Sequence, residues 1–360
     1  MEKREQYGGD VSLSGGTVQI DDFKPMTVDM RAAYELDGGD VHLTHIDLTM
    51  DGFTSQLTGE VDLLNWPEQT YRIVKSDIAL PPMKDIFFAE DNFTVTGDAS
   101  FIGSWHIFDG GRDLTGTFES ENATLNDLGF PALKGDLVWT RDRFEVFETR
   151  SGFYGGTLDI DYSMKPLGTN LPGWATLDTR YHEVDVSTLL DVFEIGGVRP
   201  EGQAGGRNLL RWPLESFSDY TGEGELLVEP DPDVRLMTRT ALNKGPAGPD
   251  SYGSVPFAFD SGPWHFPVGG RVSYELNSKW IEIGLSRIAT PYTEIEFHGR
   301  TAYGNESNIP FRVASADWQE SDRLMASFLA AVDAPIREIA IGGRGQLDGV
   351  MLGTFRSPRI

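Results

Sequence analysis

The sequence predicts a mainly β protein whose antiparallel sheet is built from irregular repeats and carries a few short helices. Three observations predict this fold: apolar residues alternate with polar ones, glycine-rich turns separate the alternating runs, and one stretch of sequence recurs farther along the chain. Composition agrees, because 41 glycines, 20 prolines and 11% aromatic residues are typical of many strands joined by turns rather than of a helical bundle.

Alternation with a period of two runs through most of the chain. Val41 and Leu43 alternate with polar partners, and Ile46 and Leu48 continue the alternation in the opposite phase. Such a pattern places apolar side chains on one face of a sheet and polar side chains on the other. The change of phase near His45 predicts a β-bulge. Further alternating runs cover residues 57–63, 158–164, 272–276 and 281–285.

Three short segments between these runs have the composition of tight hairpin turns. They are Asp37-Gly38-Gly39-Asp40, Gly155-Gly156 and Asn277-Ser278. Glycine and asparagine tolerate the positive φ angles that two-residue hairpin turns require, so each segment predicts a reversal of the chain.

The sequence also repeats itself. Residues 28–77 overlay residues 268–317 without a gap, at a shift of 240 residues and with nine identities in fifty positions. Average residue usage would give roughly three identities by chance. Repeats of this kind cannot bury their apolar face alone, and they stack on their neighbours.

A second signature occurs three times: an Arg, an Asp five residues later, a short helix, and then a glycine-led strand. We interpret the Arg and Asp of each copy as a structural joint, in which Asp caps or orients the helix and Arg pairs with it or with a neighbouring strand. The helices are predicted over 81–87, 187–193 and 321–329, with Ser187 and Ser321 as N-caps. The joint residues are Arg72, Asp77, Arg180, Asp185, Arg312 and Asp317.

These signals divide the chain into repeats. Residues 1–90 form the first repeat, 91–196 the second and 197–335 the third, and 336–360 begin a further repeat that is truncated. The chain contains no signal peptide and no run of about 20 apolar residues that a membrane helix needs. We therefore expect both ends to be cuts in a longer protein.

Charge and cysteine content exclude several functions. The formal net charge is −26, and so many carboxylates are repelled by nucleic-acid phosphates, so no nucleic-acid partner is expected. The acidic residues are spread along the chain, as on a solvated outer face. The chain has no Cys, which excludes disulfides, cysteine-ligated metals and thiol nucleophiles. No cofactor is expected.

No residue pattern indicates an enzyme. His42 and His45 are three residues apart on a strand, which should place them on opposite faces and prevent them from sharing a metal ion. The acidic turns at 37–40 and 231–233 lack the ligand spacing of a calcium loop. No carboxylate pair, nucleophile elbow or phosphate-binding loop stands out.

The recurring order of sequence motifs resembles the repeats of a known protein family. Arg-x-x-x-x-Asp, a short helix and a glycine-led strand are followed by Leu-Thr-Gly-Thr-Phe at 114–118 or Tyr-Thr-Gly-Glu-Gly at 220–224. This rhythm resembles the periplasmic repeats of AsmA/TamB-like proteins, and the stretch from Ala123 to Tyr162 is especially similar. The resemblance covers nearly the whole chain and depends on the rhythm, not on an invariant catalytic signature.

The resemblance implies an elongated antiparallel sheet, curled into an open trough with an apolar inside. It also implies a periplasmic protein, anchored in the inner membrane, that acts in phospholipid transport to the outer membrane and in outer-membrane biogenesis. The expected ligand is a phospholipid or another acyl chain. This chain lacks the family's membrane anchor, and an outer-membrane β-barrel partner would be bound through a C-terminal region that is missing here.

The alternating apolar residues are the predicted lining of this trough. The alternative is that they pack together as the closed core of a β-sandwich, because alternation does not distinguish a core from an open groove. Trp66, Trp212, Trp264 and Trp318 lie next to turns and are interpreted as covers for trough edges or helix joints. The predicted lining residues are Val41, Leu43, Leu48, Leu57, Leu137, Trp139, Leu158, Ile160, Tyr162, Val272, Tyr274, Leu276, Ile281, Ile283, Ile295 and Phe297.

Three functions remain open at this point. The first is a lipid conduit. The second is a chaperone or scaffold module that offers a sheet edge to outer-membrane β-strands by strand addition. The third is a sandwich or solenoid that binds glycans through aromatic platforms.

Overall fold

The computed structural model describes most of the chain and is mainly β, with 68% strand and 9% helix. Most of the strands belong to one large antiparallel sheet that is not closed, which confirms the predicted fold class. Contacts divide the chain into two compact units, residues 1–153 with 158–176 and residues 154–157 with 177–360. The described residues are 6–19, 24–89, 93–168, 171–192, 198–214, 216–239, 264–303, 305–331, 342–354 and 357–359.

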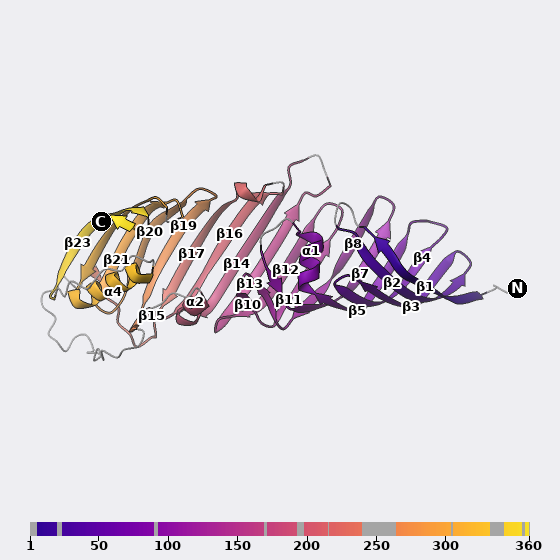
Figure 1. The fold of residues 1–360 in the computed structure, drawn as a ribbon, viewed down its shortest axis with the longest axis horizontal. Helices are drawn as coiled ribbons and strands as arrows, with labels where there is room; N and C mark the ends of the chain where they lie inside the picture. Colours follow the sequence, from indigo (N-terminus) through magenta and orange to yellow (C-terminus); the bar gives the residue numbers. More distant parts are fainter. Residues whose placement is uncertain are drawn as a thin grey trace. The chain divides into compact units, whose positions relative to one another are not determined.

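In the first unit each strand of the main sheet pairs antiparallel with the next, from β1 through β5 and then through β7, β8, β11 and β12 (Figure 1). A small separate sheet is formed by β6, β9 and β10. The main-sheet strands are β1 (Gln6–Val18), β2 (Met26–Asp37), β3 (Asp40–Met50), β4 (Phe53–Asp62), β5 (Gln69–Ala79), β7 (Asp98–Phe108), β8 (Gly111–Ser120), β11 (Leu133–Trp139), β12 (Phe144–Phe153) and β13 (Gly156–Lys165). The remaining elements are α1 (Leu80–Phe87), β6 (Val95–Thr96), β9 (Ala123–Leu125) and β10 (Leu128–Phe130).

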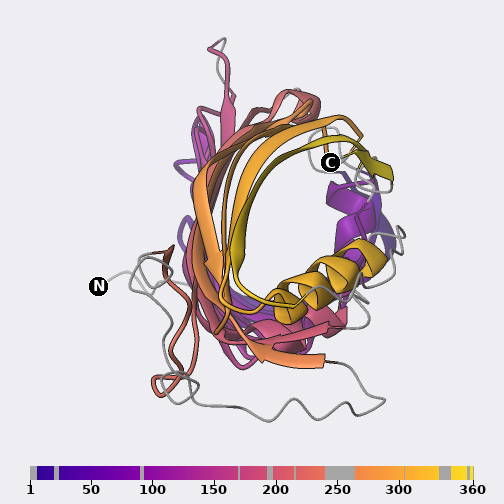
Figure 2. The same cartoon turned by 90° about the vertical axis from the view of Figure 1, so that its left-hand side faces the viewer.

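The second unit repeats this plan. Its strands pair antiparallel from β16 to β17, then through β19, β20, β21, β22, β23 and β24. Figure 2 shows β19 to β23 bending in one arc, with α4 on its concave side. The strands are β14 (Trp174–Asp185), β15 (Val198–Glu201), β16 (Gln203–Pro213), β17 (Thr221–Glu229), β18 (Trp264–Pro267), β19 (Gly269–Asn277), β20 (Ile281–Ala289), β21 (Thr293–Thr301), β22 (Ser307–Ser315), β23 (Gly345–Thr354) and β24 (Ser357–Arg359). The helices are α2 (Val186–Val192), the 3-10 turn η1 (Phe217–Asp219) and α4 (Trp318–Ala331).

The internal repeat is visible in the strand registers. Tyr34 lies opposite Leu43 in the first unit, and Tyr274 lies opposite Ile283 in the second, at the same shift of 240 residues. The β3–β4 register shifts between Leu43 and Ile46, and the β20–β21 register shifts between Ile283 and Ser286. The predicted bulge near His45 is therefore confirmed, and its counterpart occupies the same place in the second unit. The predicted repeat boundaries remain a prediction, because a compact unit is not a test of where one repeat ends.

The hairpin turns form where the sequence predicts them, with one shift. Gly38 and Gly39 separate β2 from β3, and Gly38 has a φ of 69°. The Asn277 side chain accepts backbone N–H groups at 279 and 280, which fixes the β19–β20 turn. Between β12 and β13 the turn residues are Tyr154 and Gly155, one residue earlier than predicted.

Each predicted helix is present, and a glycine-led strand of the main sheet follows each one as expected. The predicted N-caps Ser187 and Ser321 are wrong. The Asp185 carboxylate accepts the backbone N–H of Thr188 at 2.6 Å, and the Asp317 carboxylate accepts that of residue 319 at 3.0 Å. A carboxylate at this position caps the helix and also favours the positive end of its dipole. The joint aspartates, and not the serines, therefore start α2 and α4.

The α1 helix starts differently. Its N-cap is Ala79, which makes no side-chain bond, and a proline in the first turn removes one N–H that would otherwise need a partner. The Asp77 carboxylate instead lies 2.6 Å from the Lys75 ammonium. The capping role of the joint aspartate is thus absent from the first copy.

A buried polar cluster anchors α4 to the β20–β21 turn. The Glu320 side chain is 4% exposed and accepts hydrogen bonds from the Thr293 hydroxyl at 2.9 Å and from the backbone N–H of residue 292 at 3.2 Å. Its neighbour Ser321 bonds the Thr293 and Ser315 hydroxyls at 2.7 Å each. Burial is the largest effect on Glu320 and raises the pKa of its carboxyl group, because desolvation disfavours the charged form.

Glu320→Gln should remove one pH-dependent contribution to the free energy of unfolding. Because the pKa of Glu320 is raised in the folded state, this carboxyl group favours folding when protonated, and that contribution is lost as pH rises through the folded-state pKa. The variant should therefore gain stability relative to the parent chain as pH increases from 4.5 upward. Urea unfolding at a series of pH values measures this difference, with the exposed Glu275→Gln as control. A difference that does not change with pH would contradict the prediction.

The core of the first unit is small. Ala32 and Ile46 are each 5% exposed and Leu57 is 6% exposed, and half-buried apolar side chains of the same face pack around them.

We expect Leu57→Ala to lower the free energy of unfolding by about 2–5 kcal/mol, because it leaves a cavity in this cluster. Leu64→Ala is the matched control, since Leu64 is 82% exposed and its truncation should cost less than about 0.5 kcal/mol. Chemical denaturation distinguishes the two, and equal losses would count against the assigned core.

Candidate functional site

The first unit gathers its apolar side chains on one face of the sheet. The registers place Ala32 opposite Ile46, Ile46 opposite Leu57, and Leu57 opposite Ile73, so a single apolar row crosses β2 to β5. Because side chains alternate along each strand, parallel rows two residues away lie on this same face. We call it the first apolar face.

Aromatic side chains dominate the neighbouring row of the first apolar face. The Tyr71 and Trp105 rings lie 6.0 Å apart, and the Trp139, Phe144 and Tyr162 rings meet edge-on at 6.2 and 6.1 Å. In strand order this row consists of Tyr34, Leu43, Gly59, Tyr71, Trp105, Leu114, Trp139 and Phe144. The row joins strands that are distant in sequence, so the face is a product of the sheet and not of any single hairpin.

The second unit has a corresponding face, the second apolar face. Ile288 lies opposite Ile295, Ile295 opposite Val313, and Val313 opposite Leu347. At its edge Leu324 of α4 packs against a cluster around Phe266 and Val268. Leu324 therefore covers the end of the face next to the β20–β21 turn.

The opposite face of each unit is polar and charged. In the second unit Arg271 pairs with Glu225 at 2.7 Å and Arg300 with Glu282 at 2.6 Å, in each case across neighbouring strands. In the first unit Lys134 pairs with Glu119 at 2.6 Å. Exposed pairs of this kind contribute at most about 1 kcal/mol each, so this face keeps the sheet solvated more than it stabilises the fold.

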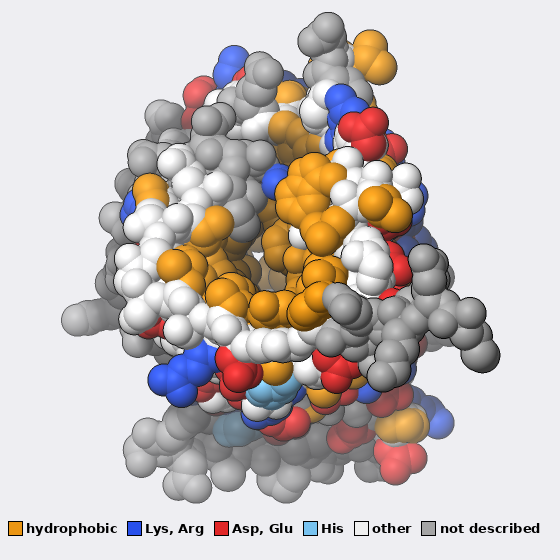
Figure 3. Space-filling model, turned by 90° about the vertical axis from the view of Figure 1, so that its right-hand side faces the viewer, with side chains coloured by type: hydrophobic (Ala, Val, Ile, Leu, Met, Phe, Trp, Pro, Cys, Tyr) orange, Lys and Arg blue, Asp and Glu red, His pale blue; other side chains and the backbone are white. Residues whose placement is uncertain are grey.

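The apolar faces are only half buried. Among the predicted lining residues, Leu57 and Leu158 are buried, at 6% and 7% exposure, and the others keep intermediate exposure. In a closed sandwich a second sheet covers this face and the inward side chains form a dry core. Figure 3 shows a hollow at the β1–β5 end of the first unit, with hydrophobic side chains gathered on its wall. The described part of the chain therefore forms an open sheet with an apolar inner face, not a sandwich.

Every predicted lining residue belongs to one of the two apolar faces. The rings and aliphatic chains that the prediction omitted, such as Trp105, Phe311 and Val313, share their rows. In β7, the strand of Trp105, Gly103 interrupts the apolar alternation and weakens the signal. On the first apolar face lie Val41, Leu43, Leu48, Leu57, Leu137, Trp139, Leu158, Ile160 and Tyr162, and on the second lie Val272, Tyr274, Leu276, Ile281, Ile283, Ile295 and Phe297.

The joint arginines lie on the polar side. Arg312 donates from Nε to the Asp348 carboxylate on the neighbouring strand β23. Arg180 donates to Asp178 at 2.8 Å. Arg72 lies in register between residues 58 and 104 of the strands on either side. These positions fit a structural joint and place the arginines away from the apolar faces.

The predicted geometry of the two histidines is wrong. The bulge adds one residue between Leu43 and Ile46, which brings His42 and His45 to the same polar face. His42 lies 3.8 Å from the Glu60 carboxylate and His45 2.9 Å from that of Asp47. In the part of the chain that the structure describes, no group of three or more potential ligands could hold a metal ion.

The tryptophans beside turns do not share one role. Trp66 is 66% exposed and covers no edge. Trp212 meets the Phe217 ring edge-on at 5.2 Å, at the end of β16. Trp318 begins α4 and lies against Gly345 at the start of β23, as expected for a helix joint. The Trp264 side chain lies outside the described residues.

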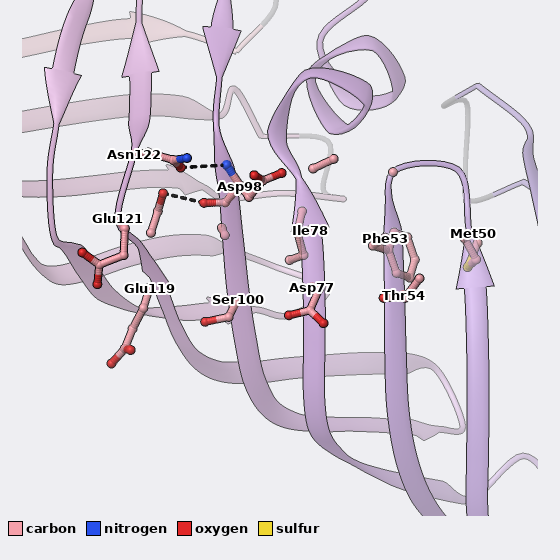
Figure 4. A pocket seen from close by; sticks show the side chains of 14 residues that line it. Met50, Phe53, Thr54, Asp77, Ile78, Asp98, Ser100, Glu119, Glu121 and Asn122 are labelled. Carbon is pink, nitrogen blue, oxygen red and sulfur yellow. Dashed lines mark hydrogen bonds between the residues drawn. The ribbon is translucent and has the colours of Figure 1, made fainter.

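A pocket of about 560 Å³ opens at one rim of the first unit, at the ends of β3, β4, β5, β7 and β8 (Figure 4). Apolar Phe53 and Ile78 and acidic Asp77 and Asp98 line it, so it lies where the apolar and polar faces meet. The backbone N–H of Asp98 donates to the Asn122 amide oxygen at 3.0 Å, which fixes this rim.

No helix among the described residues is both long and apolar enough to cross a membrane. Comparison with protein-family models, with curated proteins and with solved structures finds no match to this chain.

The absence of Cys makes the openness of the apolar faces directly testable. Leu43→Cys and Ile283→Cys should react with a soluble maleimide in the folded protein, because both side chains are only partly buried. Ile46→Cys, at a position 5% exposed on the first apolar face, should react only after unfolding. Mass spectrometry of the adducts measures the rates. Protection of the first two thiols as complete as that of the third would indicate a closed core.

Proposed function

We propose that this chain is a periplasmic segment of an AsmA/TamB-like protein whose apolar faces hold phospholipid acyl chains in transit between the inner and outer membranes, in support of outer-membrane biogenesis. The observation that carries the proposal is an apolar face, wide and half-exposed, in each unit. The periplasmic location and the route between the two membranes are inferred from the resemblance of the sequence rhythm to AsmA/TamB-like proteins.

The energetic case is simple. A sixteen-carbon acyl chain loses roughly 12 kcal/mol on entering water, at about 0.8 kcal/mol for each methylene group. The neighbouring row of Leu43, Tyr71 and Trp105, whose side chains are only partly buried, offers the chain apolar contact along the sheet. The same contact removes the exposed parts of these side chains from water, which lowers the free energy of the protein surface as well as that of the lipid. The headgroup remains in water at the open side of the sheet.

We propose no catalytic role. Where the described carboxyl groups are buried, their contacts serve the fold: Glu320 holds α4, and Glu294 pairs with Arg287 beside the same turn. The aromatic rows lie on the apolar faces rather than on the solvated ones, which disfavours glycan binding on an outer platform.

A second candidate is strand addition to a sheet edge. It is favoured by β1, a strand of 13 residues that pairs with β2 on one side. Its Val11 and Leu13 are each 44% exposed, whereas Ala32 opposite Val11 is 5% exposed. A long edge with exposed apolar side chains is a template for another strand.

A photo-cross-linking amino acid at position 43 or 283 should capture phospholipid in cells that express the protein with an envelope-targeting signal. The same amino acid at position 42 or 282 is the matched control, because each lies one residue away on the polar face. Lipid adducts at the first pair and none at the second are expected, by mass spectrometry. No lipid at position 43 or 283 would reject the lipid conduit, and crosslinks from β1 to outer-membrane proteins would favour strand addition.

A further inference from the structure

Aromatic rings on the two apolar faces lie over glycines of the neighbouring strand. The registers place Tyr71 directly opposite Gly59, and Tyr274 directly opposite Gly224. The same arrangement recurs in both units. Further directly opposed pairs on the apolar faces are Tyr34 with Gly9, Phe118 with Gly135, and Phe311 with Gly349.

The contacts are closer than any other residue would allow. A Cβ on Gly59 would lie 2.7 Å from the Tyr71 ring, and one on Gly224 would lie 2.5 Å from the ring of Tyr274. At Gly349 the corresponding distance to the Phe311 ring is 2.6 Å. Real Cβ atoms do not come this close to ring carbons, so each ring uses the space that a side chain would otherwise fill.

This arrangement changes the direction of the rings. Side chains on a strand normally stand roughly perpendicular to the sheet. A ring that occupies the place of the missing Cβ leans along the sheet, over the next strand. Glycine within a strand costs about 0.5–1 kcal/mol relative to alanine, and it marks places where another group approaches closely. Five such pairs lie on the two apolar faces.

We propose that these glycines hold the aromatic rings down against the sheet and thereby keep the space above the apolar faces free for extended acyl chains. This inference rests on the proposed lipid-binding function. It names the glycines that determine how much space above the apolar faces is left for acyl chains. The ring hydroxyls already have partners on the sheet: Tyr71 donates to Gln69 at 2.6 Å, and Tyr274 donates to the Asn208 amide oxygen. The ring surface thus offers mainly carbon to a ligand, which suits a linear alkyl chain.

Gly224→Ala and Gly59→Ala test the proposal. In each variant the new methyl group drives the opposing ring away from the sheet and into the space above it. We expect loss of co-purified phospholipid, measured by mass spectrometry, and loss of binding of the apolar fluorescent probe N-phenylnaphthylamine. Gly205→Ala is the matched control, because its Cβ would lie 3.5 Å from the nearest atom, an ordinary contact, and Gly205 faces the polar side opposite Leu227.

A double variant separates a filled groove from a damaged fold. Gly224→Ala with Tyr274→Ala removes the ring that the methyl group displaces, so probe binding should return to at least the level of the Gly205→Ala control. Circular dichroism and urea unfolding report the fold of each variant. If Gly224→Ala retains full probe binding, or if the double variant folds and does not regain it, the proposal is overturned.

The two proposals fail in different ways. If the parent chain binds the probe but never carries phospholipid, the proposed function is wrong, and the glycine–aromatic pairs are still judged by probe binding. If the parent chain carries phospholipid and Gly59→Ala and Gly224→Ala carry as much of it while folded, the pairs do not set the capacity. If the parent chain binds neither phospholipid nor the probe, both proposals are wrong.

Discussion

The feature on which the rest of this structure depends is an antiparallel sheet whose apolar face is not covered, in the described part of the chain, by a second sheet of comparable size. Strict alternation places Ala32, Ile46 and Leu57 on one side and charged residues on the other. In most β proteins such a face is buried against a partner layer. Here Leu324 of α4 and Phe266 of β18 pack at the strand ends of the second unit. The half-exposed apolar surface that remains is the basis of the proposed ligand site.

Bulges preserve this two-sided arrangement along strands that are too long for simple alternation. Because the side-chain period is two, one extra residue reverses the phase of everything that follows it. Between Leu43 and Ile46 the extra residue keeps both apolar side chains on the inner face while the sequence pattern changes phase. It also brings His42 and His45 to the same side. The bulge between Ile283 and Ser286 does the same in the second unit.

The buried carboxyl group of Glu320 serves a helix joint, whereas the buried polar groups on the apolar faces are hydroxyls, such as those of Ser55 and Ser76, which hydrogen-bond each other. Glu320, Thr293 and Ser321 form a hydrogen-bonded cluster at the turn that receives α4. A buried carboxyl group is expensive, and its raised pKa reflects that cost, yet three hydroxyl and amide donors compensate for it. This placement keeps the buried carboxyl group at the turn between β20 and β21, at the end of the second apolar face.

Much of this protein could be predicted from its sequence, because the relevant signals are local. Alternation identified the apolar faces, glycine and asparagine identified the turns, and apolar spacing identified the helices. The sequence predicted that the joint aspartates cap or orient the helices, as Asp185 and Asp317 do, but the serine N-caps it also predicted are wrong, since capping depends on where the first turn begins. Register and openness required the tertiary structure: no local pattern pairs Gly59 with Tyr71 or Gly224 with Tyr274. The sequence by itself determined which residues share a face. Only the tertiary structure decided that this face stays open, because whether a second layer covers it depends on pairings between distant strands.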